Sequence, residues 1–273
     1  MSAQDAPSRS LDPLGAYAAD VVVCLRFFSR LALALPRGLS DLAGRRRLVG
    51  AVRALPVASL VIALPAAVVL AVLTMIGLPP LASAGVALAV LAITTGALHE
   101  DGLADVCDGF FGGREPEQRL TIMRDSRTGA FGALGLALTV LVRASLLAAL
   151  ADDGPLAAAA GLMAAAAASR TAMLWPWMAT PPARNDGLAR LVGHPDRKAV
   201  LLAAATAAAI FVLLTIGFAP LAVLPATLAV VGAAWLLTSS ATRLVGGHTG
   251  DVLGATQQVA EIAVLATIAI SVT

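Results

Sequence analysis

The chain has 273 residues, of which 59% are hydrophobic and only 13% are charged, and its mean hydropathy is +0.86. These values exclude a water-soluble globular domain, whose apolar fraction and hydropathy are lower. The formal net charge of +2 gives no reason to expect a nucleic-acid partner. We therefore expect an integral membrane protein, with the lipid bilayer as its surroundings.

The N-terminal part of the chain differs from the rest. The first sixteen residues are polar and lack the features of a cleavable signal peptide. We expect residues 1–16 to form a polar tail and residues 17–273 to form a single helical membrane domain. The first apolar segment, 17–35, contains Arg26 and Arg30, so it either crosses the membrane or lies at its interface.

Apolar runs of roughly 20 residues, the length that crosses about 30 Å of hydrocarbon, recur along the rest of the chain. They occupy residues 54–78, 81–98, 131–151, 156–179, 199–218, 221–242 and 252–272. The predicted fold is an all-α polytopic bundle of seven to eight transmembrane helices.

Basic residues divide the connecting segments into two groups. Arg and Lys are concentrated in the segments that fall on one side when the spans are counted, namely 36–53, 99–130, 180–198 and 243–251. The short turns of the opposite side contain Asp152 and Asp153 and no basic residue. By the positive-inside rule, the basic segments face the cytoplasm. We expect a multi-pass protein of the bacterial cytoplasmic (inner) membrane, with its polar, motif-bearing loops on the cytoplasmic face.

One polar segment, 99–132, holds seven of the seventeen acidic residues. Within it, Asp101, Asp105 and Asp108 are spaced so that on a helix they fall within roughly 60° of one another. Repulsion among three carboxylates on one face is usually relieved by a bound cation, and oxygen ligands favour Mg²⁺ or Mn²⁺. A solvated acidic helix face is the simpler alternative.

A second polar group precedes the span that starts near residue 131. Arg124, Asp125 and Arg127 come just before Gly129, the first residue of a glycine-rich stretch. Guanidinium groups bind phosphate oxygens, and glycine lets the backbone N–H groups of a helix N-terminus approach an anion. A basic loop that binds lipid headgroups is the alternative.

A third polar group, 246–255, is a glycine-rich loop at the start of the last span. Gly250 and Asp251 lie on the same predicted face as the aspartate triad, so Asp251 either completes a metal shell or orients a hydroxyl. His248 is a candidate proton acceptor because its ordinary pKa is near neutrality. A lone histidine in a loop is also typical of a polar turn.

Ionisable residues inside the predicted spans are a further candidate site, because charges at membrane depth are costly. Arg143, Arg170 and Glu261 are the residues concerned. Arg170 and Glu261 lie at similar predicted depths, so a structural ion pair between them is the simplest interpretation. A transporter pathway is the alternative, although the chain lacks the two similar halves that many transporters have.

Four strings of the sequence together resemble the signature segments of the cobalamin synthase (adenosylcobinamide-GDP ribazoletransferase) family. They are Phe27–Leu31, Gly96–Gly109, Met123–Gly129 and Gly247–Ala255, in that order. The resemblance implies a membrane transferase that joins adenosylcobinamide-GDP to α-ribazole or α-ribazole 5′-phosphate and releases GMP, with Mg²⁺ as cofactor. It implies attack of a ribazole hydroxyl on the phosphorus nearer cobinamide.

On this basis we assign roles to the candidate residues. The expected metal ligands are Asp101, Asp105, Asp108 and Asp125. The expected catalytic residues are Asp105, Asp251, His248 and Arg124, with the choice of base between Asp251 and His248 left open. The expected substrate-binding residues are Arg127, Arg30, Gly129 and Gly250.

Two other membrane enzymes use clustered aspartates and metal ions. A CDP-alcohol phosphotransferase is the nearest alternative, but Ala104 is followed here by Asp105, where that family has arginine. A prenyltransferase would show two aspartate-rich motifs, and the sequence has one. The alanine-rich spans favour close helix packing and leave open whether the protein forms a homo-oligomer.

Overall fold

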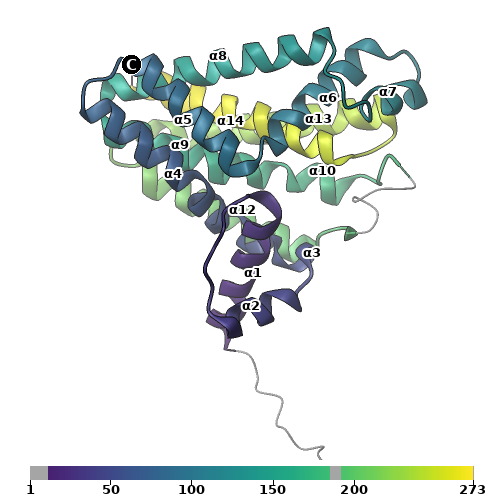
Figure 1. Ribbon diagram of the computed structural model, residues 1–273, viewed down its shortest axis with the longest axis horizontal. Helices are drawn as coiled ribbons and strands as arrows, with labels where there is room; N and C mark the ends of the chain where they lie inside the picture. Colours follow the sequence, from purple (N-terminus) through teal and green to yellow (C-terminus); the bar gives the residue numbers. More distant parts are fainter. Residues whose placement is uncertain (1–11, 185–191, 273) are drawn as a thin grey trace, which may run out of the picture.

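The computed structural model describes residues 12–184 and 192–272, and within these stretches the regular structure is helical (Figure 1). Six helical segments of the described chain are long and apolar enough to cross a membrane. They are Leu48–Met75, made of α3 (Leu48–Ala51), η1 (Val52–Ala54) and α4 (Leu55–Met75); Ala130–Asp153 (α8); Pro155–Ala179, made of α9 (Pro155–Ala172) and α10 (Leu174–Ala179); Arg197–Thr215 (α12); Pro220–Val245, made of η2 (Pro220–Ala222) and α13 (Val223–Val245); and Gly250–Val272 (α14). The predicted all-α, multi-pass membrane fold is confirmed.

The remaining predicted span, 81–98, ends in a sharp bend. Helices α5 (Pro80–Thr95) and α6 (Leu98–Gly112) pass the same test only as a pair, and they meet at an angle of 93°. Gly96 and Ala97 both have positive φ, 67° and 55°, which ends one helix and begins the next. A Cβ at Gly96 would also collide with the Arg30 side chain. The acidic segment therefore starts a helix of its own.

The N-terminal helix starts inside the stretch predicted as a tail. Helix α1 (Pro13–Phe28) begins at a proline, and the Asp12 side chain accepts a hydrogen bond from the Leu14 backbone N–H at 3.3 Å. Both are features of a helix start, so the boundary lies before residue 16. Residues 1–11 lie outside the described part of the chain.

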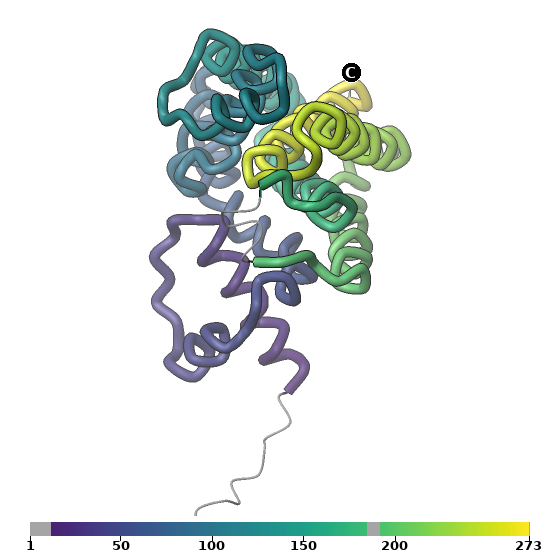
Figure 2. Tube along the Cα trace, turned by 90° about the vertical axis from the view of Figure 1, so that its right-hand side faces the viewer, coloured from purple at the N-terminus to yellow at the C-terminus, as the bar shows by residue number. Residues whose placement is uncertain are grey.

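Helix α1 is not among the candidate spans. Its 16 residues extend only about 24 Å, and an extended segment follows from Ser29 to the start of α2 (Arg37–Gly44). Figure 1 shows α1 and α2 below the bundle, with α1 running across the direction of α8 and α14. Figure 2, which views the bundle nearly end-on, shows the same separation. This arrangement favours the interfacial alternative for residues 17–35.

The alanine-rich helix α9 forms the centre of the bundle. It packs against α4, α12, α14 and α8, and Ala164 to Ala167 are completely buried. Small side chains allow such close approach between helices in a membrane. Helix α8, by contrast, leaves Leu134, Leu138 and Leu141 exposed, which is the pattern of a helix that faces lipid.

A charge-balanced network lies inside the bundle. The guanidinium of Arg143 on α8 donates to Glu261 of α14 at 2.6 Å, to Glu100 of α6 at 3.2 Å and to the Gln258 side-chain oxygen at 2.9 Å. The buried Arg170 of α9 lies within electrostatic range of the same two glutamates. Two arginines thus balance two glutamates.

The expected Arg170–Glu261 ion pair is therefore not the direct contact in this core. In the described part of the chain, Glu261 forms its ion pair with Arg143, because α8 packs against α14 and presents the guanidinium of Arg143 to α14 at that depth. Depth in the membrane can be counted along a sequence, whereas the identity of the neighbouring helix depends on tertiary packing.

Candidate functional site

The acidic residues of the triad share one face of α6. Asp101, Asp105 and Asp108 all fall within this helix, which packs against both α8 and α14. A Cβ at Gly102 would lie 2.9 Å from the backbone oxygen of Asp251, so only glycine permits this approach of α6 to the N-terminus of α14. The close approach brings a fourth carboxylate, that of Asp251, to the triad.

Asp108 lies at the N-terminus of α8. Its carboxylate accepts hydrogen bonds from the backbone N–H groups of Gly129 at 2.6 Å and Gly132 at 2.8 Å. These are amides that a helix leaves unpaired at its start, and the positive end of the helix dipole favours an anion there. A Cβ on either glycine would collide with the carboxylate. Asp108 thus occupies the donors that the sequence suggested for a phosphate, and its expected role as a metal ligand competes with this contact.

Asp105 is the centre of the carboxylate group. Its charge interacts with those of Asp251, Asp101 and Asp108, and the charge of Arg184 opposes this repulsion. In the described part of the chain, no three His, Cys, Asp or Glu side chains already converge as a metal-binding cluster. The donor chemistry nevertheless suits a hard cation, because the side chains that gather here offer carboxylate oxygens.

Asp251 is held at the first turn of α14 (Gly250–Val272). Its Oδ2 accepts a hydrogen bond from the Thr249 hydroxyl at 3.1 Å, and the Arg184 guanidinium lies 4.0 Å away. Thr249 also accepts from the Val252 backbone N–H at 3.2 Å, so it caps the helix. The helix dipole adds a favourable field for the carboxylate. Gly250 has open space around its Cα, where a ligand can approach.

His248 is buried, and its tautomer follows from its contacts. Its Nδ1 lies 3.0 Å from the Thr180 carbonyl oxygen and 3.1 Å from the Thr180 hydroxyl, which itself donates to Pro176. A carbonyl oxygen only accepts, so Nδ1 carries the proton of the neutral ring. The other nitrogen, Nε2, is then a free acceptor, and it has no hydrogen-bond partner. Burial and the nearby His194 lower the pKa of His248 below 6.5, which keeps the ring neutral.

The basic loop before α8 is exposed. Asp125 accepts from both Nε and Nη2 of Arg127, at 2.9 and 2.6 Å, and from the Arg127 backbone N–H. These hydrogen bonds lower the pKa of Asp125 to about 2. Asp125, an expected metal ligand, is thus engaged by Arg127, while Arg124 lies one residue before it. Arg30 lies away from this loop, at the α5–α6 break, where its backbone N–H donates to the Thr94 carbonyl at 2.7 Å.

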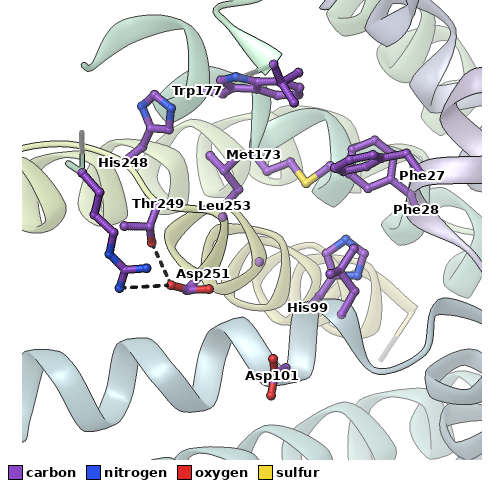
Figure 3. Close-up of a pocket in the computed structure, with 15 residues that line it drawn as sticks. Phe27, Phe28, His99, Asp101, Met173, Trp177, His248, Thr249, Asp251 and Leu253 are labelled. Atoms are coloured by element: carbon purple, nitrogen blue, oxygen red, sulfur yellow. Dashed lines mark hydrogen bonds and ion pairs between the residues drawn. The ribbon is translucent and has the colours of Figure 1, made fainter. Parts of the chain in front are cut away.

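A cavity of about 320 Å³ opens beside these carboxylates (Figure 3). Asp101 and Asp251 lie at one side of it, and His248 and Thr249 come from the adjoining loop. Aromatic and apolar side chains complete its wall. They include Phe27, Phe28, His99, Met173, Trp177 and Leu253.

The sequence matches the family described as cobalamin-5-phosphate synthase over residues 20–269. The chain belongs to this family. No solved structure matches it.

Relatives in several bacteria cover most of the chain. The protein of Rhizobium etli (strain CIAT 652) is 45% identical over 93% of this chain and 97% of its own length. That of Sinorhizobium medicae is 46% identical over 81% of this chain and 86% of its own, and that of Brucella ovis is 42% identical over 90% and 94%. All three are named adenosylcobinamide-GDP ribazoletransferase.

Segments that the cobalamin-5-phosphate synthase resemblance singled out lie together in space. His99 and Asp101 line the cavity together with the loop of His248, and Phe28 reaches it from the end of α1. Sequence reasoning missed Trp177, which lines the same cavity as Arg184. Trp177 belongs to no local motif, so only the tertiary fold reveals its position.

Proposed function

We propose that this protein is an adenosylcobinamide-GDP ribazoletransferase, which joins adenosylcobinamide-GDP to α-ribazole or α-ribazole 5′-phosphate and releases GMP. One observation carries the proposal. Three of the four family-like segments line a single cavity. The remaining segment, Met123–Gly129, ends at Gly129, whose backbone N–H donates to the Asp108 carboxylate. The names of the relatives, at 41–46% identity, supply the substrate class.

The reaction that we propose is a phosphoryl transfer. A ribose hydroxyl oxygen of the acceptor forms a bond to the phosphorus nearer cobinamide. The bond from that phosphorus to the bridging oxygen of the pyrophosphate breaks, and its electron pair leaves with GMP. Such chemistry depends mainly on positioning and on neutralising the charge of the phosphate oxygens.

Asp101, Asp105 and Asp251 are the residues that we assign to Mg²⁺. Their carboxylates come from α6 and from the start of α14, and the mutual repulsion of their charges favours a bound cation. Mg²⁺, when bound, supplies positive charge to the pyrophosphate oxygens. Asp108 has a structural role in this proposal, because its carboxylate holds the N-terminus of α8 against α6.

The other polar residues have complementary roles in this proposal. Arg127, which Asp125 orients, and Arg124 contact phosphate oxygens of the nucleotide. His248 accepts the proton of the attacking hydroxyl, because its Nε2 is an unpaired acceptor in the cavity wall. Asp251 is less suited to that step, since Thr249 and Arg184 already engage its carboxylate.

The site faces the cytoplasm in this proposal. The loops that carry Arg124, Arg127 and Arg184 adjoin the carboxylates, and basic loops remain preferentially on the cytoplasmic side. We accordingly place the protein in the bacterial inner membrane, where GDP-linked substrates and Mg²⁺ reach the site from the cytoplasm.

The activity is tested with purified protein in detergent, supplied with adenosylcobinamide-GDP and α-ribazole 5′-phosphate. We expect GMP and the joined corrinoid to form in equal amounts, and we expect both to disappear when EDTA removes Mg²⁺ and to return when Mg²⁺ is restored. Folded protein that forms no GMP under these conditions would contradict the proposal.

The proton-acceptor role of His248 predicts a particular pH dependence. Because burial lowers its pKa, the neutral, accepting ring persists below pH 6.5, and the acidic limb of kcat/KM should lie below that value. His248→Gln should lower kcat by roughly 10²–10⁴-fold and remove this limb.

His194→Gln is the matched control for this experiment. The His194 ring lies 5.6 Å from that of His248, and its charge contributes to the lowered pKa of His248. The variant should retain most of the activity and move the acidic limb to higher pH. An acidic limb that stays in place in His248→Gln would assign the proton to another group.

A further inference from the structure

The cavity beside the carboxylates has two chemically different ends. Asp101, Asp251 and His248 form a polar end, where the proposed phosphoryl transfer takes place. Phe27 and Phe28 lie at the other end, which is apolar, while Trp177 lies on the side of His248. Figure 3 shows Met173, Phe27 and Phe28 on the side opposite the Asp251 carboxylate.

The size of the cavity limits what enters it. A volume of about 320 Å³ is at the lower end of the range of small-molecule pockets, roughly 300–1,000 Å³. A corrin macrocycle with its amide side chains and axial adenosyl group is far larger than a nucleoside. The acceptor nucleoside therefore fits this cavity, and the corrin ring does not.

The apolar wall also distinguishes between the two heterocyclic bases of the substrates, guanine and the base of α-ribazole. Guanine has a carbonyl, a ring N–H and an amino group at its edge, and each needs a hydrogen-bond partner when it is buried. Phe28, Met173 and Leu253 offer none. The base of α-ribazole is a dimethylbenzimidazole, whose edge carries two methyl groups and one ring nitrogen, so its polarity matches the wall.

Nε2 of His99, beside the apolar residues, is a second polar atom of the cavity wall that lacks a partner, in addition to Nε2 of His248. His99 is only 2% exposed and lines the cavity, and its Nε2 makes no hydrogen bond. Its ring is nearly parallel to that of Phe28, with an angle of 11° and centroids 6.4 Å apart. A buried ring nitrogen without a partner costs free energy unless a ligand satisfies it.

We propose that this cavity is the acceptor subsite, in which the benzimidazole base of α-ribazole lies among Phe28, Met173 and Trp177. The ring nitrogen of the base accepts a hydrogen bond from Nε2–H of His99. The ribose then points to the polar end, with a hydroxyl near His248. This assignment rests on the proposed function and adds the position of one substrate and a residue that recognises its base.

The test compares two acceptors in wild type and in His99→Phe. One acceptor is α-ribazole 5′-phosphate, and the other is its 5,6-dimethylindole analogue, in which carbon replaces the ring nitrogen. In wild type, KM should be at least about tenfold lower for α-ribazole 5′-phosphate, because a site built to bind a polar atom rejects a ligand that lacks it. In His99→Phe this preference should vanish, while KM for adenosylcobinamide-GDP stays unchanged.

Phe28→Leu provides a second variant, and Phe211→Leu is its control. Both phenylalanines are buried, with 4% and 5% exposure, but Phe211 lines a separate cavity between α9, α12 and α13. Phe28→Leu should raise KM for both acceptors, and Phe211→Leu should leave it unchanged. If His99→Phe does not fold, Phe28→Leu decides whether this cavity binds the acceptor.

The outcomes separate the subsite from the reaction. If wild type releases GMP but these variants raise KM only for adenosylcobinamide-GDP, the subsite assignment is overturned and the reaction stands. If wild type releases no GMP but binds α-ribazole 5′-phosphate in equilibrium dialysis, and Phe28→Leu loses that binding, the subsite stands and the reaction does not.

Discussion

Asp105→Asn should reduce the rate of GMP release at least about a thousandfold, which corresponds to about 4 kcal/mol of lost transition-state stabilisation. Asp105 interacts electrostatically with all three carboxylates around it, and in the proposed mechanism its negative charge helps to hold a cation on the pyrophosphate. The amide keeps the size of the side chain. Since the change also removes repulsion, the melting temperature in detergent should be equal to or above that of wild type.

Asp152→Asn is the matched control for this prediction. Asp152 is exposed near the end of α8, away from α6, and the same chemical change there should leave GMP release and melting unaltered. The measurement is initial GMP release at saturating substrates over a range of Mg²⁺ concentrations. Near-normal activity of Asp105→Asn in folded protein would remove this carboxylate from the proposed mechanism.

The second large effect concerns stability. Arg143→Met should lower the free energy of unfolding by roughly 3–5 kcal/mol, because breaking a buried ion pair leaves its partner charge uncompensated. Both Arg143 and Glu261 are almost completely buried, and the guanidinium also donates to Glu100 and Gln258. The measurement is the thermal unfolding of purified protein in detergent.

Charge balance predicts a partial rescue of this variant. Adding Glu261→Gln to Arg143→Met restores neutrality, so the double variant should be more stable than Arg143→Met alone. Arg243→Met, at an exposed position near the end of α13, is the control and should change stability by less than about 0.5 kcal/mol. A double variant that is less stable than both single variants would show that geometry, and not charge balance, dominates this core.

Much of the helical framework was predictable from the sequence. The span predicted at 131–151 is Ala130–Asp153 in the structure, and the one at 252–272 is Gly250–Val272. Long apolar runs predict helices reliably in a membrane, because the backbone has no other way to satisfy its hydrogen bonds there. The spacing of the aspartates likewise fixed their common face once the segment was helical.

The residues that complete the site were harder to predict. The break at Gly96 depends on positive φ and on the Arg30 side chain from a distant segment. The carboxylate of Asp108 turns to Gly129 and Gly132, a contact that no local pattern indicates. Trp177 and Phe28 line the same cavity only because separate helices pack together. Each of these depends on which helices are neighbours.

The neutral core also constrains how the protein is assembled in the bilayer. Arg143 and Arg170 belong to α8 and α9, and each arginine near a helix centre opposes membrane insertion by about 2.5–3.5 kcal/mol. One counter-charge, Glu100, belongs to α6 and precedes both helices, whereas the other, Glu261, belongs to α14, which follows them. During synthesis the two cationic helices are therefore only partly neutralised until lateral association with α14 completes the electrostatic core.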